Sequence, residues 1–255
     1  MLTSHPLNDE TPTADVTTAE VNRRIVEQYH EIAALAGGLA HEIKNPLSTI
    51  RLNMELLGED FADPQTPRDR RALQKIGVVQ KECQRLQDIL DDFLNFAKLR
   101  RMNLEPTDLN GLLDDILDFF RPTADAAQIE IIRYLDPDLP SVQIDRETFR
   151  AALLNLVLNA EQAMPHGGQL VVRTKAATAG VALELIDTGT GIDAEAIGQI
   201  FDTFFSTKPG GSGLGLPTAK KIIEAHRGRI FVQSDIGHGT KFTIVLPVPP
   251  RIMGT

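Results

Sequence analysis

The chain has 255 residues, of which 42% are hydrophobic and 24% are charged, a composition typical of a soluble globular protein of one or two domains. Its net charge of −9 argues against nucleic acid or an anionic membrane as the main partner, and no apolar run approaches the roughly 18 residues of a membrane span. The single cysteine, Cys83, cannot form an internal disulfide, which favours a cytoplasmic location.

The N-terminal part of the chain predicts a tail and then a helical hairpin over residues 17–101. Residues 1–16 have the composition of a disordered tail. Thr17 and Glu20 form a capping box for a first helix that runs to about Leu57, and after a connection over residues 58–66 a second helix begins at Pro67. Apolar residues recur every three or four positions in both helices. Because one hairpin has a small core, we expect a homodimer that forms a four-helix bundle.

His41 is the most informative residue of the first helix. It lies two positions from both Leu39 and Ile43 of the apolar seam, so at about 100° per residue its ring points away from the seam. Glu42 follows directly and can accept a proton from the imidazole, which makes the other ring nitrogen a better nucleophile. The alternative is an ordinary surface histidine. A zinc-protease motif is excluded, because Asn45 stands where a second histidine would be needed.

Pro46 follows within the same helix and removes the hydrogen bond to the carbonyl of Glu42. We therefore expect a kink just beyond His41, at which the two halves of the helix can bend separately. The alternative is that the helix ends near Asn45.

Residues 102–250 predict an α/β sandwich, and residues 251–255 a short tail. Helical patterns at 108–126 and 146–164 are interleaved with strand-like alternation at 129–134, 169–175, 181–187, 229–234 and 240–246. The fold class is therefore α+β, with a two-helix hairpin in front of a mixed sandwich domain.

Two asparagines stand out on the helix at 146–164. Asn155 and Asn159 are four residues apart, so they share a face of a helix that is otherwise rich in leucine, valine and alanine. Buried amides need partners, which a metal ion with its phosphates would supply. Hydrogen bonds to the neighbouring backbone are the alternative.

Asp187 ends a strand and is in phase with the inward-facing Leu183 and Leu185. A carboxylate on the inner face needs a hydrogen-bond donor, and an adenine amino group is one. Gly189 and Gly191 follow, where a ligand can approach the backbone closely. The alternative is an ordinary turn after a strand.

A phenylalanine-rich run over residues 201–208 leads into a glycine-rich run over residues 209–216 that opens a helix. This pattern predicts a mobile flap with an apolar anchor, and free N–H groups at the helix N-terminus that can bind phosphate. Leu216 at the third glycine position excludes a Rossmann motif, and the P-loop Gly-Lys-Ser/Thr sequence is absent. A flexible linker is the alternative.

Taken in order, these runs resemble the sensor histidine kinases of two-component systems, from about residue 20 onward. His41 to Leu47 matches the H box of that family, Asn155 to Ala163 the N box, Asp187 to Gly191 the G1 box, Phe201 to Phe205 the F box and Gly211 to Gly215 the G2 box. The glycine turn at 237–240 is also similar. The resemblance implies a dimerisation and phosphoacceptor hairpin, followed by a Bergerat-type ATP-binding domain.

The resemblance also implies a role for each matched residue. His41 would accept the γ-phosphoryl group of ATP with Glu42 as base, and Asn45 would orient water for dephosphorylation of a response regulator receiver domain. Asn159 and Asn155 would hold Mg²⁺ against the phosphates. The remaining nucleotide-binding residues would be Asp187 on the adenine amine, Gly189 and Gly191 around its pocket, Gly211, Gly213, Gly215 and Leu216 in the ATP lid, and Thr240 near the adenine.

One position departs from the family pattern. Many members carry a lysine three residues after the second asparagine of the N box, and this chain has Gln162 there, which leaves the phosphate charge to Mg²⁺, the lid backbone and Lys208. Two rival functions are a gyrase- or chaperone-type ATPase, which typically has a glutamate in place of Asn155, and a non-catalytic dimeric scaffold.

Overall fold

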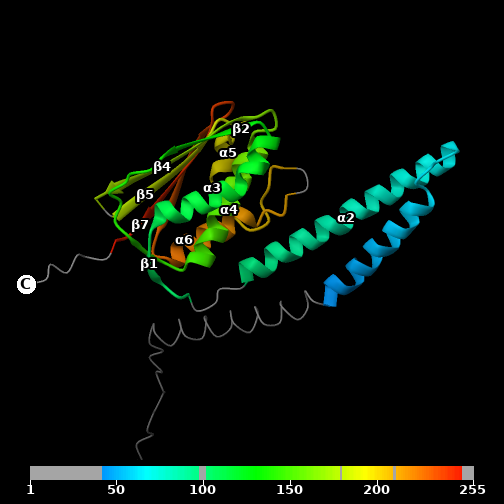
Figure 1. Ribbon diagram of the computed structural model, residues 1–255, viewed down its shortest axis with the longest axis horizontal. Coiled ribbons are helices and arrows are strands. Elements are labelled where there is room, and N and C mark those ends of the chain that lie inside the picture. Colours follow the sequence, from blue (N-terminus) through cyan, green and yellow to red (C-terminus); the bar gives the residue numbers. More distant parts are fainter. Residues whose placement is uncertain (1–41, 98–101, 179, 209–210, 249–255) are drawn as a thin grey trace, which may run out of the picture.

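Figure 1 shows the computed structural model, which describes residues 42–97, 102–178, 180–208 and 211–248. His41, the predicted tails and the first part of the first helix lie outside these ranges. No helix of the described residues is both long enough and apolar enough to cross a membrane.

The two helices of the predicted hairpin lie side by side (Figure 1). The first is described from residue 42 and continues through Pro46 to residue 60, so the alternative that it ends near Asn45 is wrong. The expected connection from residue 58 also begins too early, because the helix closes with the Phe61 N–H bonded to the carbonyl of Gly58. The second helix, α2 (Pro67–Ala97), begins at the predicted proline. Its start is capped reciprocally, since Thr66 Oγ1 accepts the Asp69 N–H and the Asp69 carboxylate accepts the Thr66 N–H.

The apolar seam of the hairpin is only partly covered within one chain. Leu47, Ile76 and Cys83 are buried. Other seam positions are between 39% and 50% exposed, and they come from both helices: Ile43, Ile50, Leu57, Val79 and Leu86. The single chain thus leaves a row of large apolar side chains in water, which is unfavourable at about 25 cal/mol per Å².

The C-terminal part is a mixed α/β sandwich, as its sequence predicts. Its five-stranded sheet has the order β2-β4-β5-β7-β6, in which β2 (Ile129–Tyr134) is parallel to β4 (Gly168–Ala177). The other neighbouring pairs are antiparallel and involve β5 (Gly180–Asp187), β7 (Gly239–Leu246) and β6 (Arg229–Asp235). The helices α3 (Leu109–Ala126), α4 (Arg146–Ala163) and α6 (Gly215–Ala225) lie on one face of the sheet (Figure 1).

Three short elements were not predicted. β1 (Glu105–Thr107) and β3 (Val142–Ile144) form a separate two-stranded antiparallel sheet, and α5 (Ala194–Ile197) is a single helical turn. Segments of three or four residues are too short to show a period of 2 or 3.6, so the pattern that identifies the longer elements is missing.

The core of the sandwich lies between the sheet and the three helices. α4 shows how it positions the site, because one side of this helix buries Phe149, Leu153 and Leu156 completely, or nearly so, against the sheet and its neighbours. Asp145 caps the helix by accepting the Thr148 N–H at 2.9 Å. The packed side thereby fixes the rotation of α4, and with it the direction in which the polar residues on the other side point.

Candidate functional site

A cavity of about 420 Å³ lies between α4, the loop after β5 and the residues that lead into α6. We call residues 211–216 the glycine segment. The wall on the α4 side consists of Asn155, Leu158, Asn159, Gln162 and Ala163. Each of them lies three or four positions from another member, so together they form one continuous stripe. The sequence-based expectation that Asn155 and Asn159 share a face is thus met, and that face borders the cavity.

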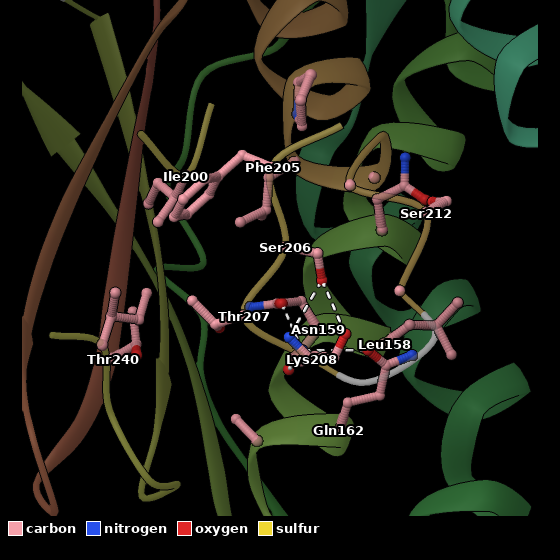
Figure 2. Close-up of a pocket in the computed structure, with 18 of the residues that line it drawn as sticks. Leu158, Asn159, Gln162, Ile200, Phe205, Ser206, Thr207, Lys208, Ser212 and Thr240 are labelled. Atoms are coloured by element: carbon pink, nitrogen blue, oxygen red, sulfur yellow. Dashed lines mark hydrogen bonds between the residues drawn. The ribbon is translucent and has the colours of Figure 1, made fainter. Parts of the chain in front are cut away.

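Lys208 reaches across the cavity to the α4 stripe (Figure 2). Its Nζ donates to Asn159 Oδ1 at 2.7 Å, to the Asn159 carbonyl at 3.3 Å and to Gln162 Oε1 at 3.1 Å. Burial lowers the pKa of Lys208, and the charges of Asp187 and Glu161 oppose that shift. Among the described residues that line the cavity, Lys208 is the one with a cationic side chain.

Gln162 is one of the residues that hold the ammonium group of Lys208. At the position where a lysine is common in the resembled family, the glutamine offers an amide oxygen, and the ammonium group comes instead from Lys208 on the other side of the cavity. The positive charge stays in the site, but it is carried by the segment that precedes the glycine segment rather than by α4.

Asp187 lies behind the cavity wall and is only 3% exposed. Its Oδ1 accepts two backbone N–H groups, from Gly189 at 2.9 Å and from Thr240 at 3.1 Å. Burial raises the pKa of Asp187, although these two hydrogen bonds and the Lys208 charge act in the opposite direction. Thr240 pairs directly with Asp187 across β5 and β7 and does line the cavity, so Asp187 lies next to a lining residue.

The glycines after Asp187 are required by close backbone contacts that the sequence did not reveal. A Cβ at Gly189 would lie 2.5 Å from the carbonyl oxygen of Ala163, and one at Gly191 would lie 2.0 Å from that of Asp235. The close approach at both positions is therefore made by the protein's own backbone. Gly191 also borders the cavity, whereas Gly189 does not.

The glycine segment is held in place by the preceding phenylalanine-rich run. The Phe204 N–H donates to the Gly213 carbonyl at 3.0 Å, and Gly213 has a φ of +67° with no room for a Cβ against Phe204. Phe205 and Ile200 close the apolar side of the cavity (Figure 2). Ser206 Oγ accepts the Lys208 N–H at 3.2 Å, which fixes the backbone from which the lysine extends.

α6 starts at the end of the glycine segment and brings its N-terminus to the cavity, where Gly215 and Leu216 are lining residues. Its N-cap residue, Leu214, has no side-chain hydrogen bond to the helix. The N-terminus of an 11-residue helix has backbone N–H groups without intrahelical partners and the positive end of the dipole, which suits a phosphate group.

The predicted magnesium ligands fit the ion in kind. Mg²⁺ prefers oxygen ligands and keeps several of them from water or substrate phosphate. Asn155 and Asn159 present amide groups to the cavity, and among the described residues no group of three or more His, Cys, Asp and Glu side chains could hold a metal. Metal binding at this place would therefore depend on two neutral amides together with the phosphates of a nucleotide.

The structure describes part of the predicted phosphoacceptor site. His41 lies outside the described residues, and its neighbours Glu42 and Asn45 are exposed on the hairpin. The backbone carbonyl of Asn45 accepts a hydrogen bond from Thr49 Oγ1 at 3.1 Å.

Sequence reasoning missed two residues of the site. Ser212 is not among the predicted residues of the glycine run, although a hydroxyl between glycines is a usable signal for anion binding. Asp92 on α2 also lines the cavity, and it accepts a hydrogen bond from Ser212. Nothing in the local sequence of α2 could have indicated this, because the two residues are 120 positions apart.

The mixed sheet with helices on one face, the asparagine stripe of α4 and the glycine segment together define an ATP-binding domain of the Bergerat type. Comparison with known families agrees, since residues 144–250 match the family model described as histidine kinase-, DNA gyrase B- and HSP90-like ATPase. Residues 31–101 match the His Kinase A (phospho-acceptor) domain. The chain belongs to the sensor histidine kinases of two-component systems.

Two similar proteins illustrate the relationship. The signal transduction histidine-protein kinase AtoS of Escherichia coli (strain K12) is 33% identical over 242 residues, and the sensor histidine kinase ZraS of the same strain is 36% identical over 222 residues. The alignments cover 93% and 87% of this chain, but only 39% and 47% of the two proteins. The chain thus spans less than half the length of either relative.

Solved structures give the same result. Full-length ShkA in complex with AMPPNP superimposes with a TM-score of 0.66 at 27% identity, covering 84% of this chain and 45% of that one. Histidine kinase ThkA in complex with the response regulator protein TrrA gives a TM-score of 0.65 at 26% identity, covering 93% of this chain and 69% of that one.

Proposed function

We propose that this chain is the kinase part of a sensor histidine kinase, which uses ATP to phosphorylate His41 and passes the phosphoryl group to an aspartate of a response regulator. The observation that carries the proposal is the cavity itself, in which the asparagine stripe of α4, the ammonium group of Lys208 and the N-terminus of α6 converge. Oxygen ligands, a cation and unpaired N–H groups are what a metal-bound triphosphate needs.

In this proposal Thr240 and Gly191 border the adenine, and its amine reaches the carboxylate of Asp187, the strand partner of Thr240. Lys208 and the glycine segment contact the phosphates. Asn159 and Asn155 would hold Mg²⁺ once Lys208 Nζ turns from Asn159 Oδ1 to the phosphates. The ion, when bound, neutralises phosphate charge and fixes the position of the phosphates. The protein's own contribution is to orient the nucleotide and to exclude water from it.

The reaction breaks the bond between the γ-phosphorus and the bridging oxygen, forms a bond between the γ-phosphorus and a ring nitrogen of His41, and releases ADP. Glu42 takes the proton that the imidazole loses. The phosphoryl group then moves to the receiver aspartate, and Asn45 orients a water molecule when the receiver is dephosphorylated. The complex of ThkA with TrrA supports a response regulator as partner.

The two rival functions are less well supported. A gyrase- or chaperone-type ATPase activates water with a carboxylate, and the α4 stripe offers the amide of Asn155 at that position, which cannot act as a base. A non-catalytic scaffold has no need of a lysine held by three oxygens inside a cavity.

Incubation with γ-labelled ATP and Mg²⁺ tests the proposed function directly. The wild-type chain should gain an acid-labile, base-stable label, as a phosphohistidine does, and His41→Gln should abolish it while still binding a non-hydrolysable ATP analogue. A label that persists at full level in His41→Gln would refute His41 as the acceptor.

We further propose that the chain acts as a homodimer in the cytoplasm. The support for the dimer is the half-exposed seam of the hairpin, to which Ile50 and Leu86 contribute side chains that are 44% and 50% exposed. The buried, unpaired thiol of Cys83 is compatible with a reducing compartment. Sedimentation should show a dimer for the wild type and a monomer for Ile50→Asp, whereas a stable wild-type monomer at micromolar concentration would contradict the dimer.

A further inference from the structure

The hairpin and the ATP-binding domain are joined by a direct side-chain contact at the cavity. Ser212 Oγ of the glycine segment donates to Asp92 Oδ2 of α2 at 2.5 Å. Both side chains are half-buried and both border the cavity, and α2 lies against α6 at this place. Figure 2 shows Ser212 on the side of the cavity opposite Thr240.

The residue before Asp92 makes a contact in another direction. Asp91 forms an ion pair with Lys44 of the first helix, three positions after His41 in the sequence. Two adjacent carboxylates of α2 therefore connect it to different partners, one to the helix that carries the phosphoacceptor and one to the glycine segment. The ATP-binding domain thus rests on α2 at the level of the H box.

The contact also has an electrostatic consequence for the cavity. A carboxylate that borders a site for a polyphosphate repels it, because the two charges have the same sign. A hydroxyl has a single proton, so Ser212 can donate either to Asp92 or to a phosphate oxygen, but not fully to both. The Leu214 N–H also donates to Ser212 Oγ, at 3.3 Å, so the contact is linked to the N-cap residue of α6.

We propose that Asp92 is a positioning residue that holds the glycine segment on α2 through Ser212, and that nucleotide phosphates compete with it for the Ser212 hydroxyl. Binding of the nucleotide then breaks the side-chain contact between the glycine segment and α2. This inference rests on the proposed function, because it takes a nucleoside triphosphate as the ligand of the cavity.

The test is the affinity of the full chain for a non-hydrolysable ATP analogue with Mg²⁺, measured by calorimetry. Asp92→Asn keeps the shape of the side chain and removes its charge, and it should bind the analogue about three- to tenfold more tightly, the range of one partly exposed charge-assisted contact. Asp88→Asn is the matched control. Asp88 lies one turn earlier on α2 and accepts a hydrogen bond from Gln84, and it does not border the cavity, so its affinity should change less than twofold.

A double-mutant cycle separates the contact from general electrostatics. In the Asp92→Asn background the acceptor of the Ser212 hydroxyl is a neutral amide oxygen and no longer a carboxylate. Ser212 then donates to phosphate more readily, so Ser212→Ala should weaken binding more there than in the wild type. A second readout is hydrogen exchange without nucleotide, in which the Leu214 amide should exchange faster in Asp92→Asn than in Asp88→Asn.

Three results would overturn the inference. Equal affinities of Asp92→Asn and the wild type would show that Asp92 does not compete with the nucleotide. An equal gain in affinity for the analogue in Asp92→Asn and Asp88→Asn would show that the effect comes from net charge alone. If neither the wild-type chain nor any variant binds the analogue, the proposed function is overturned together with this inference. This result differs from the first two, in which the wild type does bind.

Discussion

Asp187→Asn should separate the stability of the ATP-binding domain from its affinity for adenine nucleotides. Asp187 Oδ1 accepts the N–H groups of Gly189 and Thr240, and asparagine retains an Oδ1 that can accept both. The other carboxylate oxygen becomes an NH₂ group, which is a donor. The variant therefore keeps the internal hydrogen bonds and loses the acceptor that we assign to the adenine amine.

The magnitude for binding follows from the loss of one hydrogen bond to a charged acceptor, which is about 1.5–3 kcal/mol. At about 1.4 kcal/mol per factor of ten, the affinity for an ATP analogue should fall about 10- to 150-fold. Purine riboside triphosphate, which lacks the 6-amino group, is the matched ligand control. The wild type and the variant should bind this ligand with similar affinity.

The effect on stability has the opposite sign and depends on pH. Burial raises the pKa of Asp187 above its ordinary value of 3.8, so the folded protein holds the proton more tightly than the unfolded chain. The wild-type free energy of unfolding therefore falls as the pH rises from about 3.8 through the folded pKa, and the Asp187→Asn variant has no such loss. Thermal unfolding should show a variant that is at least as stable as the wild type at pH 7, with the difference shrinking as the pH falls below the folded pKa.

Asp187→Ala is the control for the internal hydrogen bonds, since it leaves the two N–H groups without an acceptor and should be destabilised by about 1–3 kcal/mol for each. Two results would refute the reasoning. If Asp187→Asn binds the ATP analogue within twofold of the wild type, Asp187 does not receive the adenine amine. If it unfolds at a clearly lower temperature at pH 7, the burial of the charge is not the dominant effect.

Two other predictions concern the cavity and the backbone beside it. Lys208→Met should weaken binding of an ATP analogue about tenfold through loss of the ammonium–phosphate contact, without weakening binding of adenosine. An equal loss for adenosine in calorimetry would contradict a phosphate contact. Gly239→Ala should destabilise the domain by about 2–4 kcal/mol and lower its unfolding temperature by about 5–10 °C. The reason is that Gly239 has a φ of +84° and that a Cβ there would lie 1.9 Å from the Asp187 carbonyl oxygen. Calorimetric unfolding of this variant at the wild-type temperature would show that the turn relaxes without strain.

The sequence by itself determined the long elements and the chemistry of the site. The strand at 129–134 lies where its alternation places it, and the helices around Asn155 and after Pro67 begin within a residue of their predicted starts, because each has a long apolar period and a capping residue. The order of the motifs was enough to indicate an ATP-binding kinase through its resemblance to the sensor histidine kinases, since the residues of each motif are local in the sequence.

The tertiary structure decided which of these signals meet. It placed Lys208 on Asn159 and Gln162, and so explained how the chain keeps a cation in the cavity without the lysine that is common on the N-box helix. It also showed that Gly189 is needed for the passage of the Ala163 backbone. These contacts join residues that are far apart in the chain, and their geometry is set by the packing of α4 against the sheet.

The contact between Asp92 and Ser212 is the clearest case of this division. Each residue is ordinary in its own segment, one on a charged helix and one between glycines. Local sequence determines helices, turns and the types of available groups, because these depend on neighbours along the chain. Which carboxylate faces which hydroxyl depends on how the hairpin and the ATP-binding domain pack, and only the folded structure specifies that.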